Sequence, residues 1–350
     1  MRSPKATIIA MADELGFAAI IRDIDAATGE PQLLDGMRRA KDAAVAELNA
    51  HTPALRLAAD WSRVMARALA TAARLVSTEP MAWTWFVSGS VARREAIPGS
   101  DIETLIALDN DVDKDGKASA LALAADVHAL LERCGFAGDA NGVLASRGRF
   151  CRRHASWAEG IERWCAEPAE DRGVVMTGLL ADAASLSGVD ELRLLTLDAA
   201  GRYPQALGAM LQDATAFRAT IPSRLRVFAT HADSVDLKQA AIEPVVKIAR
   251  WAALSANSAA VATLERLNAA ARAHTLDADD AAILRECYVS ASRIRWRDRA
   301  AAWIDGDRIT DVVSLAGLSP QERATLRDIG RELNAIRRKL TFLASTSSFR

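Results

Sequence analysis

The residues best suited to chemistry lie in one short segment, from Ser88 to Glu103. Gly89 lets backbone N–H groups approach a phosphate closely, and Ser90 adds a hydroxyl donor. Asp101 and Glu103 stand two residues apart on an expected strand, so both carboxylates point to the same face. Neighbouring carboxylates repel unless a cation lies between them, and Mg²⁺ favours such oxygen ligands while also binding phosphates. The segment therefore predicts a site for magnesium and a phosphate-bearing substrate.

Two arginines in the same loop extend this interpretation. Arg93 and Arg94 can neutralise and orient phosphate oxygens. The alternative is an ordinary surface loop with an acidic strand end, because Gly-Ser and Asp-x-Glu are each common on their own. Their combination in this order, between two strand-like runs, favours the functional interpretation.

Three strands are expected around the loop. Residues 82–87 are aromatic and β-branched and lead into the Gly-Ser pair, which predicts a strand. Residues 102–108 predict a second strand, closed by the turn at residues 109–111. Residues 174–181 are apolar and flanked by glycines, and we interpret them as a third strand that runs into Asp182.

The remaining segments are rich in alanine and other strong helix formers, which predicts helices on both sides of the strands. Thr52-Pro53 has the pattern of an N-cap followed by a first-turn proline. From about residue 191 onward the chain is expected to be helical throughout, as a bundle. Further helices are predicted over residues 117–134 with Gly135 as terminator, over 151–166 and 244–255, after the cap Asp277, and from the capping box at 319–322 to about 343.

These patterns predict an α/β (α+β) fold, in which a small mixed sheet forms a core between two helical parts. We expect an N-terminal helical region at residues 1–80, the core at residues 81–190, and a C-terminal helical domain at residues 191–350. The chain length of 350 residues is consistent with two or three domains.

Composition disfavours several classes of function. The chain has 44 Lys and Arg against 45 Asp and Glu, so a protein held to nucleic acid mainly through phosphate neutralisation is not expected. No apolar run approaches the roughly 20 residues that span a bilayer, and the N-terminal one is too short for a persuasive signal peptide. We therefore expect a cytoplasmic protein without a membrane partner. The four cysteines form no CxxC pair, so buried free thiols are expected.

The loop resembles the nucleotidyltransferase superfamily of DNA polymerase β, and more closely the family related to the N-terminal domain of protein-PII uridylyltransferase. That family's pattern is Gly-Ser-x-Gly-Arg-x-Glu, a short spacer, and then Thr/Ser-Asp-x-Asp. Ala92 stands here in place of a glycine, and Glu103 in place of the second aspartate. The matching positions are Gly89, Ser90, Arg93, Glu95, Ser100 and Asp101.

The resemblance extends beyond the loop. Residues 141–146 are similar to a family segment that follows the first helix, and residues 179–188 resemble Phe-Asp-x-Arg-x-x-x-Gly. Asp182 then corresponds to the third superfamily carboxylate, and Ala184 replaces the family arginine. The C-terminal region is similar to the family's paired substrate-binding domain, including the segments that contain Lys238, Arg250 and Arg266.

The resemblance implies transfer of a nucleoside monophosphate from an NTP to an acceptor hydroxyl, with release of pyrophosphate. It implies that Asp101 and Glu103 hold two Mg²⁺ ions, and that Asp182 binds one of them and accepts the hydroxyl proton. By the same resemblance, the C-terminal helices wall the cleft and supply Lys238, Arg250 and Arg266. The residues implied in nucleotide binding are Gly89, Ser90, Arg93, Arg94 and Ser100.

The acceptor is expected to be a protein or a small molecule. By analogy with the uridylyltransferase, it is a tyrosine on a regulatory protein, which suggests a role in signal transduction. Two alternatives stay open. Glu103 and Ala184 favour a catalytically weak or inactive module that senses nucleotides or binds proteins on the same fold. An RNA-acting nucleotidyltransferase is disfavoured by the near-neutral charge.

Overall fold

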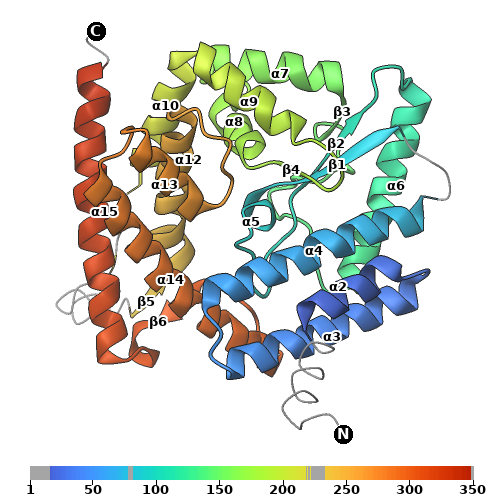
Figure 1. Cartoon of the computed structure of the whole chain (residues 1–350), viewed down its shortest axis with the longest axis horizontal. Coiled ribbons are helices and arrows are strands. Elements are labelled where there is room, and N and C mark those ends of the chain that lie inside the picture. The colour runs from blue at the N-terminus through green and yellow to red at the C-terminus, as the bar shows by residue number, and fades with distance from the viewer. Residues whose placement is uncertain (1–15, 78–81, 218, 220, 222–232, 348–350) are drawn as a thin grey trace, which may run out of the picture. The chain divides into compact units, whose positions relative to one another are not determined.

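The fold is taken from a computed structural model, which describes residues 16–77, 82–217, 219, 221 and 233–347 (Figure 1). The chain divides into two compact units. The first comprises Met1–Trp157 and Ala183–Asp190, and the second comprises Ala158–Asp182 and Glu191–Arg350. The chain therefore crosses between the units three times, after Trp157, after Asp182 and after Asp190.

The described part of the first unit begins with three helices that pack on one another: α2 (Phe17–Ala26), α3 (Glu30–Asn49) and α4 (Ala54–Val76). An apolar stripe along the third helix is buried, and it includes Trp61 and Met65. The expected cap at Thr52 is wrong, because Pro53 occupies the N-cap position and the Thr52 hydroxyl donates instead to Glu47.

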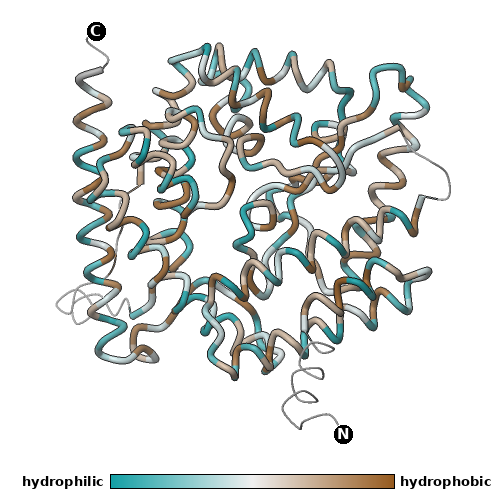
Figure 2. The backbone as a smooth tube through the Cα atoms, viewed as in Figure 1, coloured by the Kyte–Doolittle hydropathy of each residue, from teal (hydrophilic) through white to brown (hydrophobic). Residues whose placement is uncertain are grey.

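A four-stranded mixed sheet follows, in the order β3-β2-β1-β4. The two central strands are antiparallel, with Trp83 opposite Leu108 and Val87 opposite Thr104. The second of these strands is apolar after its first residue, which Figure 2 colours toward brown, and every residue of it is buried. The strands are β1 (Trp83–Val87), β2 (Thr104–Leu108), β3 (Cys151–Arg153, parallel to β2) and β4 (Ala184–Ser185, antiparallel to β1).

The expected helix at residues 117–134 is confirmed as α6 (Lys114–Arg133), with Gly135 in the left-handed conformation after it. The expected helix at residues 151–166 is α7 (His154–Ala166), and its first three residues form β3 instead. The third expected strand is wrong. Residues 174–181 form the helix α8 (Gly173–Ala181), because a continuous apolar run of this length is compatible with either structure when buried.

The second unit is a helical bundle with its own core, which includes Ala181, Ala200, Met210 and Leu254. Within its described residues, the helices after α8 are α9 (Glu191–Arg202), α10 (Pro204–Thr215), the π-helix η1 (Lys238–Ile242), α12 (Glu243–Ser255), α13 (Thr263–Arg272), α14 (Ala278–Asp305) and α15 (Pro320–Ser347).

Two helix caps predicted in this region are confirmed. Asp277 accepts hydrogen bonds from the backbone N–H groups of Asp279 and Asp280. Ser319 and Glu322 bond each other's backbone N–H reciprocally, as a capping box requires. The expectation of helix throughout is wrong where β5 (Ser234–Asp236) and β6 (Val312–Ser314) form a two-stranded sheet, followed by the 3₁₀ turn η2 (Leu315–Gly317).

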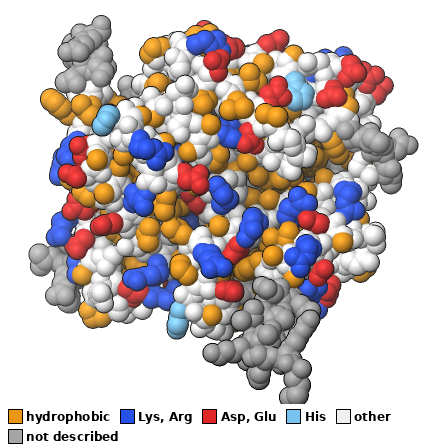
Figure 3. All heavy atoms as spheres, in the orientation of Figure 1, with side chains coloured by type: hydrophobic (Ala, Val, Ile, Leu, Met, Phe, Trp, Pro, Cys, Tyr) orange, Lys and Arg blue, Asp and Glu red, His pale blue; other side chains and the backbone are white. Residues whose placement is uncertain are grey.

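The surface carries mixed charges, and the cysteines are unreacted thiols. On the face shown in Figure 3, Lys and Arg side chains are interspersed with Asp and Glu. All four cysteines are free; Cys151, Cys165 and Cys287 are buried, and burial raises the pKa of the Cys151 thiol to about 11. Among the described residues, no helix is both long and apolar enough to cross a membrane.

Candidate active site

The Gly-Ser pair lies at the end of a strand and opens a single helical turn. Ser88 directly follows β1, and its N–H donates to the backbone oxygen of Glu103 at 3.1 Å. The turn that follows is α5 (Gly89–Ala92), with Gly89 at φ +60°. The expected polar loop is thus partly helical, and its first N–H groups lie at a helix start, where anions are favoured.

Gly89 is in close contact with the side chain of Glu103. A Cβ atom placed on Gly89 would lie 2.4 Å from a carboxylate oxygen of Glu103, which is closer than any such contact in a real protein. Positive φ and this contact together require glycine at the position. Gly89 and Glu103, which are 14 positions apart in the sequence, are therefore brought together by the pairing of β1 with β2.

Asp101 and Glu103 lie immediately before β2. Ile102 between them is fully buried and pairs with Gly138, while both acidic residues are half-buried. Alternation along an extended chain places the two carboxylates on the face opposite Ile102. Two carboxylates on one face of a chain segment are a suitable oxygen donor set for Mg²⁺. Within the described residues, no group of three His, Cys, Asp or Glu side chains gathers into a larger metal site.

The rest of the loop is held by its own contacts. Arg93 forms an ion pair with Glu95, with Nε 2.8 Å from Oε2 and both side chains about nine-tenths buried. The backbone N–H of Ala96 donates to the Ser62 hydroxyl on α4 at 2.9 Å. Arg93 therefore stabilises the loop, whereas Arg94 is exposed. Phosphate binding by either arginine stays a prediction.

Ser100 closes the turn that leads into the acidic pair. Its hydroxyl accepts a hydrogen bond from the Ile97 N–H at 3.0 Å, and its own N–H donates to the Ile97 carbonyl at 2.9 Å. Gly99 between them has φ +70°. Ser100 thus fixes where Asp101 begins, and its expected contact with a nucleotide stays a prediction.

A buried hydrogen-bond network, with partners on α6 and in the loop at Ala145, holds the start of β2 in place. The Thr104 hydroxyl lies 2.9 Å from Nε2 of His128 on α6, and it accepts from the N–H of Ala145 at 2.9 Å. Burial lowers the pKa of His128 to about 4, so the ring is neutral at pH 7 and its Nε2 can accept a hydrogen bond from the Thr104 hydroxyl. Sequence reasoning missed this pair, and a single histidine in a helix gave no signal for it.

Asp182 lies in the second unit and is buried between two arginines. Arg250 donates to its two carboxylate oxygens from Nε at 2.9 Å and from Nη2 at 2.5 Å. Arg266 donates to the same carboxylate from Nη1 at 2.6 Å. Both oxygens of Asp182 thus already accept hydrogen bonds, a role that the sequence did not predict. Metal binding by Asp182 stays a prediction.

The three basic residues predicted for the C-terminal region are not all in one place. Arg250 on α12 and Arg266 on α13 meet at Asp182. Lys238 is exposed at the start of η1 and takes no part in this cluster. Their expected position around the active-site cleft stays a prediction.

The antiparallel strands, the Gly-Ser turn and the adjoining acidic pair are typical of nucleotidyltransferases. Comparison with family models agrees with this class. Residues 38–171 match the model described as "Putative nucleotidyltransferase DUF294", and residues 204–343 match that described as "Putative nucleotidyltransferase substrate binding domain". The chain belongs to this nucleotidyltransferase family. No curated protein was found to match the chain.

The two matched regions divide the site residues. The first contains the whole segment from Ser88 to Glu103, and the second contains Lys238, Arg250 and Arg266. Asp182 falls between them. The family assignment thus rests on the loop and on the helical domain, and it is independent of any role for Asp182.

Proposed function

We propose that this protein is a magnesium-dependent enzyme that transfers a nucleoside monophosphate from an NTP to an acceptor hydroxyl. The observation that carries the proposal is the contact between Gly89 and the Glu103 carboxylate, inside the segment that matches the nucleotidyltransferase family. This contact brings backbone N–H groups that could donate hydrogen bonds to a phosphate close to an acidic side chain. In the reaction, the acceptor hydroxyl loses its proton to water and its oxygen forms a bond to the α-phosphorus. The bond from that phosphorus to the oxygen that bridges it to the β-phosphorus breaks, and pyrophosphate leaves.

Asp101 and Glu103 would hold the magnesium, because they are carboxylates on one face of one extended segment. When bound, the metal neutralises the triphosphate and the negative charge that develops on the leaving oxygen. The backbone N–H groups at Gly89 and Ser90 would hold terminal phosphate oxygens at the start of α5. Orientation by these fixed groups lowers the entropic part of the barrier.

A second candidate is a module that binds nucleotides without turnover. The same contact favours it, because the Glu103 carboxylate lies against Gly89, where a phosphate would approach. The family's shorter aspartate at position 103 would leave more room. A nucleotide that binds with magnesium but yields no pyrophosphate would support this candidate.

The acceptor is proposed to be a protein side chain or a small molecule with a hydroxyl group. A tyrosine on a regulatory protein, as in the uridylyltransferase, is the specific form of this proposal. The test is pyrophosphate release from each of the four NTPs, with and without Mg²⁺, in the absence and presence of candidate acceptor proteins. Release that needs both metal and acceptor supports transfer. If no NTP binds under any condition, the proposal is wrong.

A further inference from the structure

The buried cluster around Asp182 contains two arginines that differ in how many of their guanidinium nitrogen atoms form hydrogen bonds. Arg266 is almost fully buried, and it uses Nε and Nη2 on the backbone oxygens of Ala260 and Ala181 in addition to its bond to Asp182. Each of its three nitrogen atoms is thus occupied. This arginine ties α13 to the end of α8 and is a structural residue.

Arg250 is held on one edge only. Its Nε and Nη2 bind Asp182, while Nη1 has no hydrogen-bond partner in the part of the chain that the structure describes. The side chain is 15% exposed. Nη1 lies beside Gly178 on α8, where an added Cβ atom would stand 3.4 Å from it. The absence of a side chain at Gly178 leaves the approach to Nη1 more open.

We propose that Arg250 binds a phosphate oxygen of a ligand through Nη1, and that Asp182 is its positioning residue and no metal ligand. This rests on the proposed function, since it assigns a substrate contact to the substrate-binding domain. A guanidinium fixed on one edge by a carboxylate loses little entropy when the other edge binds an oxyanion. Buried ion pairs stabilise folds weakly, so geometric control is a better reason for this one.

The second unit contains a matched control. Arg295 on α14 binds Asp311 with the same edge, with Nε at 2.6 Å and Nη2 at 3.0 Å, and it is 11% exposed. Arg299 binds the same carboxylate at 2.8 Å. This cluster joins α14 to the residue before β6. Removal of Arg295 therefore deletes the same charge from an equivalent ion pair at another place.

The test measures binding to the full chain by calorimetry, without turnover, using inorganic tripolyphosphate, each NTP and inorganic phosphate. Arg250→Gln is expected to weaken at least one of these ligands by roughly ten- to a hundredfold, the loss typical of a charge-assisted hydrogen bond. Arg295→Gln is expected to change none of them. Gly178→Ala is expected to act in the same direction as Arg250→Gln, with a smaller effect.

The source of the phosphate follows from which ligand is affected. Loss of NTP and tripolyphosphate affinity identifies the nucleotide. Loss of inorganic phosphate binding to NTP-saturated protein, with NTP affinity unchanged, identifies a phosphate on the acceptor. If a folded Arg250→Gln protein binds all three as before, or if Arg295→Gln weakens them equally, the proposal is overturned. These outcomes do not depend on pyrophosphate release, so they separate this proposal from that of transferase activity.

A double-mutant cycle tests the role given to Asp182. Asp182→Asn should weaken the same ligand as Arg250→Gln, and it should cause no further loss in the Arg250→Gln background. Thermal denaturation of each variant verifies that it is folded. A further loss of Mg²⁺-dependent NTP binding in the double variant would show that Asp182 acts on the metal, and the positioning role would then be wrong. Should Asp182→Asn fail to fold, Gly178→Ala and Arg250→Gln still decide the arginine contact.

Discussion

At the scale of single residues, the acidic pair makes the sharpest demand on the proposed function. Asp101→Asn keeps the size of the side chain and removes its charge. We expect Mg²⁺-dependent turnover to fall by at least a hundredfold, since a lost metal ligand costs several kcal/mol of transition-state stabilisation. The melting temperature should stay unchanged, because Asp101 is only half-buried. Pyrophosphate release and thermal denaturation measure both.

The control for this variant is Asp111→Asn, an exposed aspartate in the turn after β2. It makes the same chemical change outside the loop and should leave turnover intact. Equal activity of the Asp101→Asn and wild-type proteins would remove Asp101 from the metal site.

Glu103 permits a prediction in the opposite direction. Glu103→Asp shortens the side chain by one methylene and withdraws the carboxylate from Gly89, which it now contacts. We expect turnover to be preserved or raised, because the phosphate approach opens and the charge is kept. Initial rates at saturating Mg²⁺ would show this. A folded but inactive Glu103→Asp protein would mean that the longer side chain is a necessary ligand.

How far the sequence predicts the site depends on the range of the interactions and on how many partners a charged side chain could have. The association of Gly89 with the acidic pair could be inferred, because a strand, a turn and a strand are adjacent in the chain. The ion pair that binds Arg93 to Glu95 and the one that binds Asp182 to Arg250 could not. A charge pattern does not say whether an arginine faces a ligand or an aspartate, and the pair with Asp182 joins residues far apart in the sequence.

At the scale of elements, the same distinction holds. Caps are local, so Asp277 and the capping box at Ser319 follow from three or four residues. The helical structure of α8 could not be predicted locally, because a buried apolar run is compatible with strand or helix, and α8 packs against α9 and α10. The three-residue strands β5 and β6 are likewise too short to give a period. Each depends on a partner that is distant in the chain.

The network beneath β2 yields a prediction at this scale. A protonated His128 ring could no longer accept a hydrogen bond from the Thr104 hydroxyl. The ring lies near Trp85, and among the described residues no carboxylate forms an ion pair with it. Its pKa in the folded protein is about 4, below the ordinary histidine value of 6.5. As pH falls from 6.5 to 4, His128 is protonated in the unfolded chain but stays neutral in the folded chain, so the free energy of unfolding falls. The limit of this effect is about 3 kcal/mol.

His128→Gln tests this because glutamine can still accept from Thr104 but does not titrate. We expect the free energy of unfolding of the wild type to fall more steeply than that of the variant between pH 6.5 and 4, with no difference in slope above pH 7. Urea denaturation at several pH values measures it. Parallel pH profiles of the two proteins would contradict a neutral, buried His128.

At the scale of the whole molecule, the three crossings between units determine what can be cut. A fragment limited to the first family match, residues 38–171, lacks β4 and leaves the edge of β1 unpaired. A fragment of residues 204–343 lacks α8 and α9, and with them Ala181 and Ala200 of its core. We expect neither to fold alone, as judged by near-ultraviolet circular dichroism and cooperative melting. A cooperatively melting 38–171 fragment would contradict this expectation.

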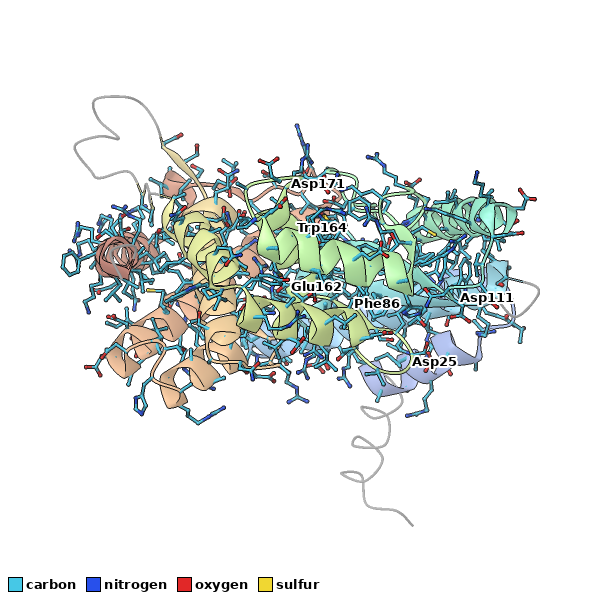
Figure 4. The ribbon with its side chains drawn as sticks, turned by 90° about the horizontal axis from the view of Figure 1, so that it is seen from above. Asp25, Phe86, Asp111, Glu162, Trp164 and Asp171 are labelled. Atoms are coloured by element: carbon cyan, nitrogen blue, oxygen red, sulfur yellow. The ribbon has the colours of Figure 1, made fainter. Side chains whose placement is uncertain are left out.

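Because β1 pairs with β4, a strand synthesised much later, β1 lacks this edge partner during part of synthesis on the ribosome. Val87 lies opposite Ala184, so the first strand emerges about 100 residues ahead of its edge partner. At about 5–20 residues per second, that interval lasts roughly 5 to 20 s. Throughout it, an aromatic, apolar strand that includes Phe86 (labelled in Figure 4) presents an open hydrogen-bonding edge. Nascent chains are therefore most exposed to misassociation in this window, and slower translation before residue 184 should lower the soluble yield.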